Sequence, residues 1–181
     1  MPETSLFPVV CTAEVPTSVI DKFLSEAHAA SERLVPGSEP CLAVITTTAA
    51  AAAADGALLL PSSPSRPPLE PFASPFLGQP VEAIAQRLSS ADASFFAVLD
   101  ERSAADETAL VVASRGAGGG GGVQAVRVTF DEVQRLLTAL DVASLGIEEV
   151  RSIAESNGGV YGPDRESTRK GQPAPRKRLG A

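Results

Sequence analysis

Apolar residues along this chain follow two different periods, one typical of helices and one typical of strands. Between residues 18 and 34 they recur every three or four positions, which predicts an amphipathic helix with one apolar face. The same spacing predicts helices at 80–90, from about Thr129 to Leu140, and at 145–156. Ser18 with Asp21 and Thr129 with Glu132 have the spacing of capping boxes, so we expect both pairs to start their helices.

Short apolar runs between these helices predict the strands of a sheet. The last run alternates, with Val126 and Val128 on one side and Arg127 on the other, so one of its faces is buried and one meets water. The polar residues 100–107 predict a turn between two strands. The predicted strands are 6–12, 41–48, 94–99, 108–113 and 123–130.

These elements predict one α+β domain, formed by residues 1–48 and 79–162. We expect one small mixed or antiparallel sheet of four to five strands, with helices packed mainly on one face. Between the two parts, six alanines end at Ala54, and seven prolines fall between Pro61 and Pro80. Such composition buries too little surface to offset ordering entropy, so 49–78 is interpreted as a disordered insertion, and 163–181 as a disordered basic tail.

Three features of the insertion carry further hypotheses. Phe72, Phe76 and Leu77 are apolar enough to pack back onto the domain. The stretch 61–66 fits P-x-x-P-x-R, a ligand pattern for polyproline-binding grooves, and Ser63 and Ser74 each precede a proline, as in proline-directed phosphorylation sites. Because such patterns arise easily in Pro/Ser-rich sequence, we favour a spacer without either role.

The charge of the chain is divided between an acidic body and a basic end. The net charge is −7; residues 1–162 hold 20 acidic and 9 basic residues, and residues 163–181 hold 2 acidic and 6 basic. An acidic body repels a phosphate backbone, so we expect no nucleic-acid partner except through the tail. We expect no membrane association and an intracellular, cytoplasmic protein, with nuclear import through Arg176, Lys177 and Arg178 as the alternative.

Residues that often carry chemistry are few here. His28 is the single histidine, within a predicted helix, and Cys11 and Cys41 fall in predicted strands, where free thiols behave as apolar side chains. The glycines of 116–122 satisfy G-x-G-x-x-G but lead into a strand, whereas a nucleotide site needs them to open a helix. We expect no metal and no cofactor.

Four charged residues are the candidates for ligand or partner contacts. Asp100 ends a predicted strand, where carboxylates can line a crevice, although a solvated loop is the simpler interpretation. Glu148 and Glu149 occupy the first turn of a helix, where the backbone dipole favours negative charge. Arg127, flanked by apolar residues, either pairs with one of these glutamates or binds an anion; we favour a structural ion pair.

The stretch 139–150, ALDVASLGIEEV, followed by NGGVY at 157–161, resembles the closing motif of the uncharacterised domain of unknown function 6924 family, N-L-x-x-A-N-M-D-F-E-E-F and then G-V-F-R-G-F. Two asparagines of that motif correspond to Ala139 and Ser144, and its aromatic-Arg-Gly ending becomes Tyr161-Gly162-Pro163. The resemblance implies the same order of strands and helices and adds no activity.

We therefore expect a non-catalytic protein-interaction or regulatory module of an uncharacterised family, with an unidentified protein partner and no catalytic residues. The alternative is an enzyme or small-ligand-binding protein whose site lies around Asp100, Arg127 and Glu148/Glu149. A single concave pocket that collects these side chains would favour the alternative.

Overall fold

The computed structural model describes residues 5–46, 60–114 and 122–163. The glycine run 116–121, the alanine run and the basic cluster 176–178 lie outside the described residues. Helices and strands follow the apolar pattern closely, and their bounds are β1 Phe7–Cys11, α1 Thr17–Leu34, β2 Leu42–Val44, α3 Val81–Ser89, β3 Phe95–Leu99, α4 Glu101–Asp106, β4 Thr108–Ala113, β5 Gln124–Thr129, α5 Phe130–Asp141, α6 Ile147–Ser156 and β6 Val160–Tyr161.

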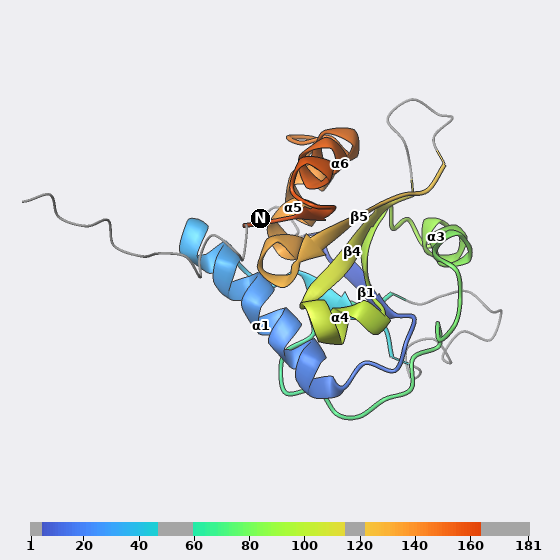
Figure 1. Cartoon of the computed structure of the whole chain (residues 1–181). Coiled ribbons are helices and arrows are strands. Elements are labelled where there is room, and N and C mark those ends of the chain that lie inside the picture. The colour runs from blue at the N-terminus through green and yellow to red at the C-terminus, as the bar shows by residue number, and fades with distance from the viewer. Residues whose placement is uncertain (1–4, 47–59, 115–121, 164–181) are drawn as a thin grey trace, which may run out of the picture.

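The strands form one mixed sheet in the order β2-β1-β3-β4-β5-β6 (Figure 1). β1 runs parallel to β2 and β3, β4 is antiparallel to β3 and β5, and β6 is parallel to β5. The sheet thus has six strands rather than the four to five expected. The additional strand, β6, has only two residues, which is too short to leave a period in the sequence.

Both faces of the sheet are covered, which corrects the expectation that the helices pack mainly on one face. Helices α1, α5 and α6 bury the larger core, in which Phe23 and Phe130 meet edge to face at 5.1 Å. Helix α3 lies on the opposite face of the sheet (Figure 1). Its Ile84 and Leu88 belong to the smaller core together with Phe96 of β3. Successive strand residues point to opposite faces, so β1, β3 and β4 each contribute side chains to both cores.

Residues 60–78, called the strap here, lie against the domain. Phe76 is fully buried in the smaller core. The Ser65 N–H donates to the Leu42 carbonyl at 2.9 Å, and the Val44 N–H donates to the Ser65 hydroxyl at 2.8 Å, so the strap closes the outer edge of β2. This part of the predicted insertion therefore has fixed contacts, which the sequence predicts only for Phe72, Phe76 and Leu77. Of these three, Leu77 remains 43% exposed.

Three local predictions about helix starts are wrong. Neither Ser18 nor Thr129 caps a helix through its side chain: α1 starts after Pro16, and Thr129 is the last residue of β5. The segment 100–107, expected to be a turn, contains helix α4. Asp100 starts that helix with a capping box, in which its carboxylate accepts from the Arg102 N–H and its N–H donates to the Ser103 hydroxyl.

Candidate functional site

The structure places the four charged candidates in two separate groups. Arg127 forms a bidentate ion pair with Asp100, with Nη1–Oδ1 at 2.9 Å and Nη2–Oδ2 at 2.5 Å. Glu148 instead accepts from the Gln124 amide at 2.7 Å. The expected ion pair of Arg127 therefore exists with a different partner from the glutamates named in the sequence analysis.

Strand alternation explains the change of partner. Val126 and Val128 of β5 point into the larger core, which also contains Val150 of α6. Arg127 lies between them in sequence and so points to the other face of the sheet, away from Glu148 and Glu149. Asp100 follows β3 directly, and its side chain meets Arg127 two strands away.

The Asp100–Arg127 pair is nearly closed to solvent and satisfied. The Arg127 side chain is 10% exposed and that of Asp100 is 23% exposed. Partial burial disfavours the Asp100 carboxylate, but the Arg127 guanidinium, the Ser103 hydroxyl and the Arg102 N–H more than offset it, so the pKa of Asp100 lies below its ordinary value. Such a pair fixes the end of β3 to β5 and leaves few hydrogen-bonding groups available to a ligand.

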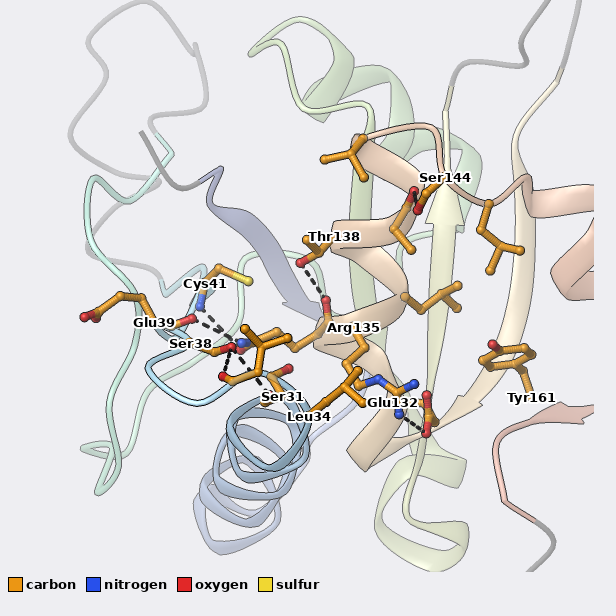
Figure 2. A pocket seen from close by; sticks show the side chains of 16 residues that line it. Ser31, Leu34, Ser38, Glu39, Cys41, Glu132, Arg135, Thr138, Ser144 and Tyr161 are labelled. Carbon is orange, nitrogen blue, oxygen red and sulfur yellow. Dashed lines mark hydrogen bonds and ion pairs between the residues drawn. The ribbon is translucent and has the colours of Figure 1, made fainter. Parts of the chain in front are cut away.

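A different site emerges on the opposite face, where a cavity of about 590 Å³ opens between α1 and α5 (Figure 2). None of the four candidates lines it. We call this cavity the groove; its lining residues are Ser31, Leu34, Val35, Ser38, Glu39, Cys41, Glu132, Gln134, Arg135, Leu136, Thr138, Ala139, Val142, Ser144, Leu145 and Tyr161.

The groove has an apolar rim that is unusually open. Leu34, Val35 and Val142 are 61%, 58% and 66% exposed, and they belong to the ends of α1 and α5 that flank the cavity. Ala139 contributes only a methyl group to the wall between them, which leaves room in the groove. Exposed apolar side chains gathered on one cavity indicate a binding surface rather than scattered surface residues.

Polar groups converge at one end of the groove. Arg135 donates to Glu132 at 2.8 Å on the side of α5 that faces Tyr161 (Figure 2). Burial raises the pKa of Glu132, although Arg135 opposes the rise, and burial together with the Glu132 charge raises the pKa of Tyr161. The Gln134 amide holds the far wall, donating to the Glu39 carbonyl at 3.2 Å and accepting from the Cys41 N–H at 3.4 Å.

The groups that most often carry catalysis have structural surroundings. Both cysteines are free and buried, and burial raises the pKa of Cys41 to about 11 and that of Cys11 to about 12, so their thiolates are disfavoured. His28 Nε2 lies 2.9 Å from the Ser38 carbonyl and ties α1 to the following loop. Within the described residues no group of three or more His, Cys, Asp or Glu side chains could hold a metal ion.

The two hypotheses on the strap motifs meet a structural obstacle. Ser65, inside the P-x-x-P-x-R stretch, is bound to the edge of β2, so a polyproline-binding groove would have to compete with the chain's own sheet. The Ser74 hydroxyl donates to the Cys11 carbonyl at 2.5 Å, whereas Ser63 is exposed. Ser63 is thus the more accessible of the two serines.

No protein-family model, curated protein or solved structure matches the chain. Within the described ranges, no helix is long and apolar enough to cross a membrane.

Sequence reasoning missed Glu132, Arg135 and Tyr161 as site residues. On α5 a weak signal existed, because Glu132, Arg135, Ala139 and Val142 recur at three- and four-residue steps beside the buried stripe. The contribution of Tyr161 depends on the pairing of β6 with β5, which no local pattern reveals.

Proposed function

We propose that this protein is a non-catalytic interaction module that binds a segment of a partner protein in the groove. The observation that carries the proposal is the apolar rim formed by Leu34, Val35 and Val142 around a cavity of about 590 Å³. Side chains of this kind exposed at the ends of two packed helices lose contact with water when a partner covers them.

The dimensions of the groove suit a short segment. Along α5 the lining residues run from Glu132 to Val142, and a helix rises about 1.5 Å per residue, so the groove is about 15 Å long. That length accommodates about five residues of extended chain or about three turns of helix. Recognition of a partner helix or strand by an apolar groove is a common mode of peptide binding.

A small-molecule ligand in the same groove is the second candidate. Its support is the volume, which falls within the usual range of about 300–1,000 Å³ for ligand pockets, together with the Glu132–Arg135 pair at one end. We favour the peptide because the rim residues Leu34, Val35 and Val142 are more than half exposed, and a peptide covers more of this exposed surface than a small molecule does. A site around Asp100, Arg127, Glu148 and Glu149 has no comparable support, since the first two satisfy each other and the glutamates lie on the other face.

The resemblance noted above would place the family's motif on the groove. Ala139 and Ser144, which stand where the motif has asparagines, both line it, as does Tyr161 at the aromatic position. If this chain is a member of that family, relatives with asparagines would have a more polar groove and a different partner.

The neutral dye Nile red, whose fluorescence rises in apolar surroundings, tests whether the groove accepts an apolar occupant. We expect strong fluorescence with the parent protein and a loss of most of it in Ala139→Trp, which fills the cavity, and in Val142→Glu, which adds a charge to the rim. Leu77→Glu is the matched control, because Leu77 is 43% exposed and does not line the groove. Equal fluorescence from all four proteins would exclude the groove as a binding surface.

A photo-crosslinking residue at position 142 tests the peptide against the small molecule in cells that express the protein. We expect a crosslink to one defined segment of a partner, lost in the Ala139→Trp background and retained with Leu77→Glu. Nile red binding without any protein crosslink at position 142 would support the small-molecule candidate instead.

A further inference from the structure

The groove is surrounded by carboxylates. Glu39 and Glu132 line it directly. Two more carboxylates act on its walls: the Asp141 charge contributes to the raised pKa of Cys41, and the Glu149 charge contributes to that of Tyr161. An apolar surface bordered by charges of one sign attracts a partner of the opposite sign.

Among the residues that the structure describes, Arg135 is the one cation that lines the groove. It is already paired with Glu132, whose side chain is only 14% exposed. Arg66 of the strap approaches Glu39 at 3.9 Å, but both side chains are about 70% exposed, so this contact contributes little. Counting only the described residues, Glu39, Asp141 and Glu149 therefore leave the surroundings of the groove with negative charge.

We propose that the partner segment is cationic: one or two apolar side chains enter the groove between α1 and α5, and flanking arginines or lysines meet the carboxylates around it. This inference rests on the function proposed above and specifies the chemistry of its partner. The apolar contacts supply most of the affinity, since they bury surface, and the charges supply selectivity and speed of association.

Two labelled ten-residue peptides test the inference by fluorescence anisotropy with the full chain. Both carry two leucines at positions 4 and 7; one has four arginines, and the other has glutamine in their places. We expect the arginine peptide to bind about tenfold more tightly in 50 mM salt, because several weak exposed pairs add together, and we expect 500 mM salt to remove most of that difference.

Charge-neutralising variants locate the effect. Glu39→Gln combined with Asp141→Asn is expected to weaken binding of the arginine peptide several-fold and to leave the glutamine peptide unchanged. Glu82→Gln combined with Glu101→Gln is the matched control, since Glu82 belongs to α3 on the opposite face and Glu101 to α4. If the control pair has the same effect as the groove pair, a general field of the acidic body is responsible, and the inference is wrong.

The outcomes separate this inference from the function on which it rests. Equal binding of both peptides, each blocked by Ala139→Trp, would overturn the charge preference and leave the interaction module intact. Nile red binding with no peptide binding would overturn both. The chain's own residues Arg176, Lys177 and Arg178 have the proposed chemistry; if the arginine peptide binds only after all three are changed to Gln, the occupant is the tail and a separate partner is excluded.

Discussion

Two arginine–carboxylate pairs on opposite faces of the sheet, Arg127–Asp100 and Arg135–Glu132, differ in almost every respect. Arg127 and Asp100 make two hydrogen bonds across the strands, and additional donors from α4 satisfy the carboxylate. Arg135 and Glu132 make a single contact within one helix, beside an open cavity. The first pair holds elements together, whereas the second has capacity left for a partner. Charge in the sequence is therefore a poor guide to function unless its partners are known.

The largest effect on stability should come from breaking the Asp100–Arg127 pair. Arg127→Ala leaves the Asp100 carboxylate without its counter-ion and is expected to lower the free energy of unfolding by about 2–3 kcal/mol, measured by urea denaturation. Arg127→Lys should recover only part of this loss, because lysine cannot make the two parallel hydrogen bonds. Unchanged stability in Arg127→Ala would show that the pair holds nothing together.

Arg135→Ala provides the comparison, because it breaks the Glu132–Arg135 pair beside the groove. The side chain of Arg135 is 38% exposed and contacts Glu132 three residues away on the same helix, so we expect a loss of less than about 1 kcal/mol in the same denaturation experiment. Equal losses for Arg127→Ala and Arg135→Ala would remove the distinction between the two faces.

The next effect concerns the wall of the groove that ends at Tyr161. Gly162 has φ +140°, and a Cβ at this position would lie 2.2 Å from Thr129 Oγ1. Gly162→Ala should therefore cost about 2 kcal/mol of unfolding free energy and reduce Nile red binding, since β6 has to move. Gly158→Ala, with φ +73° and no atom within 4 Å of the added Cβ, measures the backbone cost alone. Thr129→Ala should partly rescue Gly162→Ala; the absence of rescue would place the strain elsewhere.

The effects of pH on stability should be smaller than those of these substitutions, and they should have opposite signs for Asp100 and Glu132. The pKa of Asp100 is lowered from 3.8, so in acid the unfolded state binds a proton first, and this contribution to stability is lost as pH falls through the folded-state pKa. The pKa of Glu132 is raised from 4.5, so here the folded state binds the proton first, and stability is lost as pH rises from 4.5 through the folded-state pKa.

Chemical denaturation at a series of pH values measures both contributions. Asp100→Asn should flatten the dependence below pH 3.8, and Glu132→Gln should flatten the decline that begins at pH 4.5. If the contributions of Asp100 and Glu132 to the slope of unfolding free energy against pH had the same sign, the distinction between the Asp100–Arg127 and Glu132–Arg135 pairs would be contradicted.

The smallest change in stability is expected on the rim. Val142 is 66% exposed, so Val142→Ser should alter the free energy of unfolding by no more than about 0.5 kcal/mol. Nile red binding should nevertheless fall clearly, because the apolar rim has lost one of its members. A large loss of stability would mean that Val142 belongs to the core rather than to a binding surface.

The sequence predicts the elements well where periods are long. The apolar stripe of α1, with Phe23 and Leu24, and the alternation of β5 both appear in the structure as expected. Helix α4 was missed because its six residues are mostly polar, and a capping box led by aspartate with serine at the third position is easily mistaken for a turn. Thr129 occupies the N-cap position of α5 as expected, but it also pairs with Thr108 in the sheet and its hydroxyl makes no capping hydrogen bond.

The candidate site was less accessible to sequence reasoning. The sequence presents Asp100 and Arg127 as candidates for ligand or partner contacts, but not as partners of each other, because 27 positions separate them and only the strand order brings them together. The groove depends on the packing of α1 against α5 and on the return of β6 to the sheet, which are tertiary events. Residues such as Ala139 matter in the groove because their side chains are small, and a small apolar side chain gives no sequence signal of a binding site.

The strap also covers an edge of the sheet at which another molecule could add a strand. An open strand edge is a template on which another chain can add a strand, and β2 lies at such an edge. Ser65 occupies one carbonyl and one N–H of β2, and Pro64 and Pro67 on either side of it have no N–H to offer a newcomer. The prolines that make this segment resemble a spacer in the sequence thus hinder the addition of a strand from another molecule at the β2 edge.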